Sequence, residues 1–318
     1  MARKLRIQYP GAHYHVMNRG DRREPIFKDD ADRERFRETL GEACAKTGWR
    51  VHAYCLMPNH FHLVIETPQP NLVAGMKWLL GTYTGRFNRR HKLFGHLFSG
   101  RYKALVVDES GNGYLKTVCD YVHLNPVRAK MIAQAQQLAV YRWSSYRLYL
   151  MPPRRRPVWL RVDRLLGEHR VPKDSAAGRK HFGAVMEARR AGELAEEFKA
   201  VRRGWCLGDK AFRKELLSQM HERRGAEHYG EERFESDEAK ALSIVEQELG
   251  RRGWTAGELK ARRKGDKHKV AMAARLRRET TMTYKWIAER LVMGSWNNVS
   301  NRLAATRNKS SARLKVKV

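Results

Sequence analysis

The sequence predicts an α+β protein, in which a ferredoxin-like split βαβ domain is followed by a helical C-terminal part. Three observations predict this. Apolar residues in the first half alternate in some segments and recur at helical spacing in others, in the order β-α-β-β-α-β-α. The last quarter shows helical periodicity only. The stretch MPPRRRPV at 151–158 has the proline content of a linker.

Each element of the first half has its own signal. Strands are expected at 12–18, 50–57, 60–66 and 97–108, and helices at 29–47, 71–90 and 113–124. Gly48 ends the first helix, and Asn71 is the expected N-cap of the second. Only Pro58 and Asn59 separate the second and third strands, which predicts a hairpin. The four strands should form one antiparallel sheet with the helices on one face.

We therefore expect three parts. Residues 1–150 form the sheet domain, and 237–318 form a helical DNA-binding domain with a helix-turn-helix. Residues 151–236 are a basic linker and helical region to which the sequence assigns no role.

The charge balance points to an anionic partner. The chain has 64 Lys and Arg against 34 Asp and Glu, a formal net charge of +30. Such an excess favours nucleic acid phosphate over a membrane surface, because no apolar run is long enough to span a bilayer. The N-terminus lacks the features of a signal peptide, and none of the four cysteines forms a C-x-x-C pair. A cytoplasmic, nucleoid-associated protein is expected, with no disulfide framework and no cysteine zinc site.

The stretch YCLMPNHFHLVIE at 54–66 carries the first candidate site. His60 and His62 occupy positions i and i+2 of a predicted strand, so their imidazoles share one face while Phe61 points to the other. Two adjacent imidazoles can hold one divalent metal. The alternative is a polar sheet face, and the spacing alone leaves both open.

The stretch CDYVHLNPVRAKM at 119–131 carries the second candidate site. Tyr121 and Asn125 are four residues apart, so a phenol and a carboxamide share one helix face. Pro126 disfavours helical geometry at Asn125, so the helix should kink or end there. The alternative places Tyr121 in the core and uses Asn125 as a cap.

Together these pieces resemble a known family. The pair HFH, the segment YVHLNPVRA, the opening YHVMNRG and the order of elements resemble the single-tyrosine HUH transposases, and among them the REP-associated tyrosine transposases. The resemblance covers about residues 5–150. It implies that His60 and His62 hold a divalent metal, Mg²⁺ or Mn²⁺, with Asn125 as third ligand and Tyr121 as nucleophile. His123 ranks below Asn125, because it should point away from the face of Tyr121.

The resemblance also implies an activity. Tyr121 would attack a scissile phosphate of single-stranded or hairpin DNA, leaving a 3′-OH and a 5′-phosphotyrosine link that a second 3′-OH can reverse. One tyrosine makes one cut at a time. A full transposition cycle therefore needs two active sites, as in a homodimer, or a reset of one site to its free tyrosine between cuts.

Several residues are candidates for DNA contacts. They are Asn18 and Arg19 after the first strand, the group Arg101, Tyr102 and Lys103 that suits a single-strand groove, and Arg128. Each can equally be a surface residue. His13 and His15 alternate on the first strand and are expected on the sheet surface; the alternative is a place beside the site.

The C-terminal part should bind duplex DNA. From 251 to 318 there are 19 Lys and Arg against 4 Asp and Glu. The segment 283–307 predicts two short helices joined at Gly294, with Ser295 as an N-cap candidate. Their inner faces carry Trp286, Ile287, Leu291, Val299 and Leu303, and the second helix presents Trp296, Asn297, Asn298, Asn301 and Arg302 to DNA.

Two other functions compete with the transposase. A non-catalytic DNA-binding regulator would keep the fold and the basic tail but would need neither Tyr121 nor the histidine pair. A single-strand RNA binder on a ferredoxin-like sheet ranks last, because the candidate strands lack the aromatic run such binders use. Metal dependence separates nicking from plain binding.

Overall fold

The computed structural model describes residues 7–191, 198–202, 204–222 and 235–315. The chain contacts divide it into two compact units, Met1–His228 and Tyr229–Val318. The expected boundaries after residues 150 and 236 stay predictions. No helix among the described residues has both the length and the apolar character to cross a bilayer.

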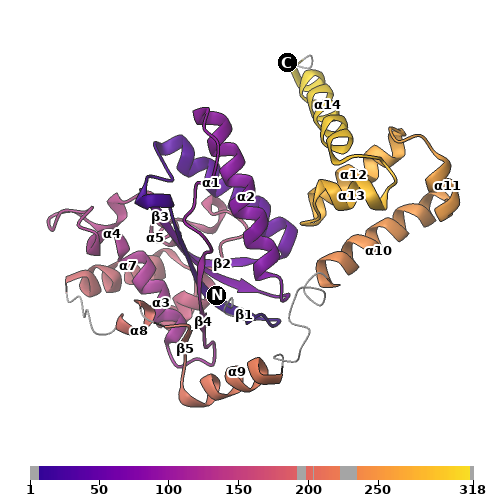
Figure 1. The fold of residues 1–318 in the computed structure, drawn as a ribbon. Helices are drawn as coiled ribbons and strands as arrows, with labels where there is room; N and C mark the ends of the chain where they lie inside the picture. The colour runs from indigo at the N-terminus through magenta and orange to yellow at the C-terminus, as the bar shows by residue number, and fades with distance from the viewer. Residues whose placement is uncertain (1–6, 192–197, 203, 223–234, 316–318) are drawn as a thin grey trace. The chain divides into compact units, whose positions relative to one another are not determined.

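The first unit is built on one mixed sheet (Figure 1). Its strands are β1 (Ala12–Arg19), β2 (Arg50–Met57), β3 (His60–Thr67), β4 (Lys103–Val107) and β5 (Cys206–Leu207), in the spatial order β2-β3-β1-β4-β5. The first four are antiparallel neighbours, which confirms the predicted ferredoxin-like order. The two-residue β5 pairs parallel to β4, and the sequence did not predict it.

The helices cover both faces of the sheet, which corrects the expectation of one covered face. The helices α1 (Asp30–Thr47) and α2 (Leu72–His91) share one apolar core with the odd-numbered β3 residues Phe61, Leu63 and Ile65. The helix α3 (Tyr114–His123) shares a second core with Val64, whose side chain points to the opposite face. The sheet is therefore the middle layer of the unit (Figure 1).

The second face is completed by residues to which the sequence assigned no role. Leu165, Phe182, Phe198 and Leu207 are buried in the same core as α3. The helices of this unit beyond α3 are α4 (Asn125–Arg128), α5 (Tyr146–Tyr149), α6 (Asp163–Glu168), α7 (Ala176–Ala191), α8 (Lys199–Arg202) and α9 (Lys210–Glu222), with the short 3-10 turns η2 (Leu138–Val140) and η3 (Pro153–Arg155). A further 3-10 turn, η1 (Asp21–Arg23), lies between β1 and α1. Part of the expected linker region is thus core of the first unit.

Two local expectations were wrong. The last strand of the split βαβ plan begins at Lys103 instead of residue 97. Asn71 precedes α2 but does not cap it, because its side chain accepts a hydrogen bond from the Trp49 indole (2.8 Å) and donates one to the Thr47 carbonyl (2.9 Å). By contrast, Asp29 caps α1 and Gly48 ends it with φ 74°.

The second unit is helical. Its helices are α10 (Glu235–Arg252), α11 (Ala256–Ala261), α12 (Lys267–Glu279), α13 (Tyr284–Arg290) and α14 (Trp296–Lys315). Ile287, Leu291, Val299 and Leu303 are buried as expected, while Trp286 is partly buried and its indole donates to Glu238 (2.8 Å). Gly294 has φ 85° in the turn between α13 and α14, and α14 runs past the expected end at 307.

Candidate active site

The histidine pair lies at the start of β3, directly after the tight turn at Pro58 and Asn59. The turn is anchored to the loop after β1, because the Asn59 carbonyl accepts from the Gly20 amide (2.8 Å). A side chain at Gly20 would collide with the Glu24 carbonyl, so only glycine fits this crossing. Phe61 is fully buried on the opposite face, packed edge-on against Phe98 and at a tilt against Phe36.

His60 is half-buried, and its free ring nitrogen can be assigned. Its Nδ1 lies 2.7 Å from the Asn59 side-chain oxygen, which can only accept, so Nδ1 carries the hydrogen and Nε2 keeps a lone pair. Burial, followed by the nearby Arg19 charge, lowers the pKa of His60 to about 4. A neutral imidazole with an unused Nε2 is the form that binds a metal.

His62 is held by a histidine that the sequence placed on the sheet surface. His15 is buried, its Nε2 lies 2.9 Å from His62 Nδ1, and the two rings are stacked. When His62 donates this hydrogen bond, its Nε2 keeps a lone pair. Burial, with smaller effects of His15 and His60, holds the pKa of His62 well below its ordinary value. Strand pairing between β1 and β3 creates this contact, and no local sequence pattern contains it.

Tyr121 reaches the histidines from α3, across the face that the sheet shares with this helix. Its ring makes edge contacts with His62 (5.7 Å between centroids) and His15 (5.6 Å). The Arg128 guanidinium lies 4.6 Å above the same ring, and Phe198 packs on it at 5.6 Å. Tyr121 as a whole is 9% exposed, so these neighbours cover most of its ring.

Asn125 follows the end of α3 and begins α4, where Pro126 breaks the helix as expected. It is buried, and its amide nitrogen has no hydrogen-bond partner among the described residues. No contact that the structure records joins Asn125 to His60 or His62 within the described part of the chain. His123 turns elsewhere: its Nε2 bonds the Ser145 hydroxyl (2.8 Å) and its ring lies beside Tyr149.

The residues present fit a divalent metal. His60, and His62 when its Nδ1 donates to His15, each keep an Nε2 lone pair on one face, with second-sphere partners that fix the ring orientation. Asn125 adds a buried carboxamide one helical turn past Tyr121. A separate group of metal-binding side chains, His13, His52 and Glu66, lies further along the same strands.

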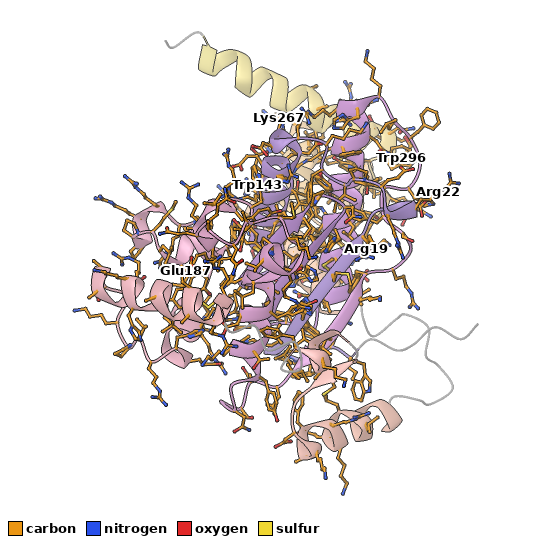
Figure 2. All side chains as sticks on the ribbon, turned by 90° about the vertical axis from the view of Figure 1, so that its left-hand side faces the viewer. Arg19, Arg22, Trp143, Glu187, Lys267 and Trp296 are labelled. Carbon is orange, nitrogen blue, oxygen red and sulfur yellow. The ribbon has the colours of Figure 1, made fainter. Side chains whose placement is uncertain are left out.

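The candidate DNA contacts lie in different environments. Arg19 pairs with His60 across β1 and β3 and is exposed, as Figure 2 shows, whereas Asn18 is buried and accepts from the Arg19 amide. Arg101 and Lys103 are exposed, but Tyr102 is buried in the core under α1 and α2, where its ring cannot stack on a base.

In the second unit, Trp296 and Asn297 are exposed at the start of α14. Asn298 is partly used internally, since it donates to the Met293 carbonyl (2.7 Å) and accepts from Arg302 (2.9 Å). Asn301 and Arg302 are exposed on the next turn. These residues share the outer side of one helix beginning at residue 296.

The sequence also missed the groups that hold the tyrosine helix. Asp120, next to Tyr121, is fully buried and accepts a hydrogen bond from His169 (2.8 Å) while pairing with Arg189 of α7 (2.9 Å). No motif links these positions, which are 49 and 69 residues apart in the chain. In the sequence, the signal for this network is Asp120, an acidic residue on an otherwise apolar face of the predicted helix.

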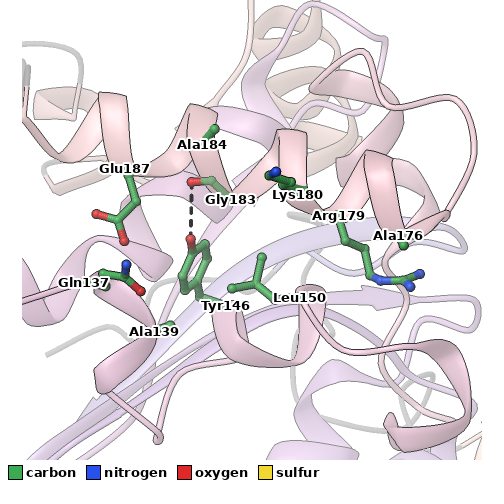
Figure 3. Close-up of a pocket in the computed structure, with 10 residues that line it drawn as sticks. All are labelled: Gln137, Ala139, Tyr146, Leu150, Ala176, Arg179, Lys180, Gly183, Ala184 and Glu187. Carbon is green, nitrogen blue, oxygen red and sulfur yellow. Dashed lines mark hydrogen bonds between the residues drawn. The ribbon is translucent and has the colours of Figure 1, made fainter.

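A pocket between η2, α5 and α7 is separate from this site (Figure 3). Its wall includes Tyr146, whose hydroxyl donates to the Gly183 carbonyl at 3.4 Å. Glu187 in the same wall already accepts from the Leu138 amide (2.7 Å) and from Arg190 (2.7 Å). None of the candidate catalytic, metal or DNA-contact residues lines this pocket.

The fold and the site together define a class: an α+β domain in which a sheet displays a histidine pair toward a tyrosine on a covering helix. Residues 8–125 match the family described as IS200-like transposases. This match confirms the resemblance that the sequence motifs predicted.

The solved structures that are similar to this chain include the REP-associated tyrosine transposase bound to a REP hairpin. The sequence identity is 13%, the match covers 47% of this chain and 86% of that one, and the TM-score is 0.40. No curated protein matches the chain.

Proposed function

We propose that this protein cuts and rejoins single-stranded DNA through a 5′-phosphotyrosine intermediate on Tyr121, at hairpin or palindromic repeat sequences. The observation that carries the proposal is the meeting of Tyr121 on α3 with His62 on β3, beside His60. The transposase-family domain over residues 8–125 supports it independently.

The metal would be bound by His60, His62 and Asn125. Two imidazoles and a carboxamide oxygen leave coordination positions open, which suits Mg²⁺ or Mn²⁺ with bound water and phosphate oxygens. A divalent ion at this position supplies polarisation of the scissile phosphate. His15 holds His62, and Asn59 holds His60, in the orientation that this binding needs.

In the chemical step, the Tyr121 hydroxyl loses its proton and its oxygen bonds to phosphorus. The P–O bond to the 3′ oxygen breaks, so one fragment ends in a 3′-OH and the other is joined to the tyrosine through its 5′-phosphate. Phenolate is a weaker base than a sugar alkoxide, so an incoming 3′-OH can displace it and rejoin DNA without ATP. Arg128, over the Tyr121 ring, is placed to contact the same phosphate.

DNA would be held by basic groups in both units. Arg19 is exposed beside His60, where it can contact the strand next to the cut. In the second unit, the outer side of α14 carries Trp296, Asn297 and Arg302 in a strongly basic segment. That unit would bind duplex or hairpin stems in the manner of a helix-turn-helix.

One observation favours the competing function, a non-catalytic DNA-binding regulator. Tyr121 is buried beneath Phe198 and Arg128, as a side chain without a substrate would be. The histidine pair with two free Nε2 atoms weighs against this reading, because a regulator has no use for it.

The test uses end-labelled single-stranded hairpins from the sequences that flank the gene, with Mn²⁺ or Mg²⁺, on denaturing gels. Wild type should cut in a metal-dependent way and shift the downstream fragment by covalent attachment, and Tyr121→Phe should do neither. His123→Gln is the matched control, a second α3 side chain that turns away from the site. Hairpins that are bound but never cut, equally by wild type and Tyr121→Phe, would support the regulator.

A further inference from the structure

A second cluster of metal-binding side chains lies along the same sheet face. His13 on β1, His52 on β2 and Glu66 on β3 each place a ligand atom within 4.8 Å of the other two. Glu66 Oε2 is 3.3 Å from His52 Nε2 and 3.9 Å from His13 Nε2. Donor atoms around a tetrahedral zinc ion are about 3.4 Å apart, so these positions need only small movements to share one ion.

The hydrogen on His13 can be located. Its Nδ1 lies 2.9 Å from the Gly11 carbonyl oxygen and 3.3 Å from Glu109 Oε2, both of which are acceptors. Nδ1 is therefore protonated, and Nε2 directs a lone pair toward Glu66. A backbone carbonyl on the far nitrogen of a histidine is a common second-sphere arrangement of metal ligands.

The cluster contains buried nitrogen atoms without hydrogen bonds. His13 is 1% exposed and His52 is fully buried. Among the described residues, the one polar side chain open to His13 Nε2 and to the ring nitrogens of His52 is Glu66, whose Oε2 lies 3.3 Å from His52 Nε2. A hydrogen bond there satisfies only one of the three nitrogen atoms, and buried polar atoms are normally paired, so the others call for a ligand.

The protonation states suit metal binding. Burial, followed by the neighbouring His52, lowers the pKa of His13 to about 3, and burial also lowers the pKa of His52. Burial alone would raise the pKa of Glu66, but hydrogen bonds from His52 and Arg161 hold it at about 2. Two neutral imidazoles and one carboxylate are the ligand set of many zinc sites.

The positive charges of nearby arginines disfavour binding of a cation to this cluster. Arg50 contacts Glu66 Oε1 (2.9 Å) and Arg161 contacts Oε2 (2.9 Å), while Arg164 pairs with Glu109 (3.2 Å). The Arg50 side chain is 53% exposed, and Arg161 has a second partner in Asp163. Because Arg161 uses the same Glu66 oxygen that an ion would need, it competes directly with the ion.

We propose that His13, His52 and Glu66 form a second metal site, for one zinc-class divalent ion that joins β1, β2 and β3. It is distinct from the His60 and His62 site, because Glu66 is four residues past His62, about 13 Å along the strand. Its ligands are nitrogen-rich and enclosed, which suits a borderline d-block ion rather than Mg²⁺. The proposal does not depend on DNA cleavage.

The test is binding of Co²⁺, a spectroscopic substitute for zinc, to the full chain carrying His60→Ala and His62→Ala. We expect one equivalent bound with the intense d–d bands of a four-coordinate site. Adding Arg161→Gln should tighten binding, because the competitor for Glu66 Oε2 is gone, and adding Glu66→Gln should abolish it. Absence of bound Co²⁺ in the double variant, or equal binding after Glu66→Gln, overturns the proposal.

Folding is checked by circular dichroism in chelator, where each variant must melt cooperatively. If Glu66→Gln does not fold, X-ray absorption at the cobalt edge of the His60→Ala/His62→Ala chain decides. A shell with two imidazoles supports the site, and a shell of oxygen atoms alone overturns it.

Discussion

At the scale of single residues, the candidate site depends on what each imidazole does with its second nitrogen. His60 uses Nδ1 on Asn59 and His62 uses Nδ1 on His15, so both rings can present Nε2 to the same side. In this scheme His15 is no metal ligand: it meets the edge of the Tyr121 ring and bonds to His62 Nδ1. It is a positioning residue that acts through His62.

Replacing His15 should therefore weaken metal binding without removing a ligand. We expect His15→Ala to lower Mn²⁺ affinity about 10- to 100-fold, the usual effect of losing a second-sphere partner. Electron paramagnetic resonance of free Mn²⁺ during titration measures this. His123→Ala removes an equally buried histidine outside the site, so unchanged affinity in His15→Ala, or an equal loss in His123→Ala, would refute the assignment.

The same burial predicts a pH dependence of stability. The pKa of His15 and of His60 is about 4 in the folded protein, mainly through burial, against about 6.5 in an unfolded chain. The unfolded state thus binds more protons between these values, so stability is complete above pH 6.5 and falls as the pH drops toward 4. Urea unfolding midpoints should fall across this window, and less steeply in His15→Gln. If the urea midpoint fell equally steeply with pH in wild type and in His15→Gln, this would argue against a buried neutral His15.

At the scale of elements, the position of α3 decides whether Tyr121 meets the histidines. The buried Asp120 fastens α3 to His169, which follows α6, and to Arg189 on α7. Phe198 beside α8 then covers the tyrosine ring. His169, Arg189 and Phe198 thus position and cover Tyr121.

Breaking this attachment should be costly. Asp120→Ala leaves His169 and Arg189 without their carboxylate, and loss of one partner from a buried pair typically destabilises by about 3–5 kcal/mol. Urea denaturation of Asp120→Ala and Glu34→Gln makes the comparison, because Glu34 pairs with Arg37 on the surface of α1 and should contribute less than about 1 kcal/mol. A loss for Asp120→Ala as small as that for Glu34→Gln would count against the network.

The elements show where sequence reasoning succeeds and where it stops. Period-2 alternation placed His60 and His62 on one face, and the i,i+4 spacing with Pro126 placed Tyr121 and Asn125 around a helix end, because these patterns are local. His15 and Phe198 reach the site only through strand pairing and packing over long separations. The two-residue β5 is too short to show a period, which is why the sequence did not predict it.

At the scale of the whole molecule, the chain contains a sheet unit, in which residues 8–125 match the IS200-like transposase model, and a basic helical unit. Residues 251–318 carry 19 of the 64 Lys and Arg. Phosphate contacts of this kind supply affinity that falls steeply with salt, whereas exposed side chains such as Trp296 and Asn297 can select among sequences.

The two units should therefore be separable by mutation. We expect Asn297→Ala with Arg302→Ala to weaken binding to a hairpin with a long duplex stem and to lower its salt slope by about one. Cutting of a short single-stranded substrate should remain at the wild-type level. Fluorescence anisotropy at several salt concentrations measures hairpin binding and its salt slope. Replacement of the exposed Arg35 on α1 by alanine is the control. A matching loss of short-substrate cutting would show that the units do not divide the work in this way.

The central claim is that Tyr121 bonds to DNA, and mass spectrometry of trapped protein tests it most directly. Trypsin cleavage after Lys116 and Arg128 gives a peptide, residues 117–128, in which Tyr121 is the sole tyrosine. After reaction with a hairpin and nuclease trimming, the account predicts that this peptide gains the mass of a 5′-linked nucleotide only when metal is present. A nucleotide on another peptide, or none although the hairpin is cut, would contradict it.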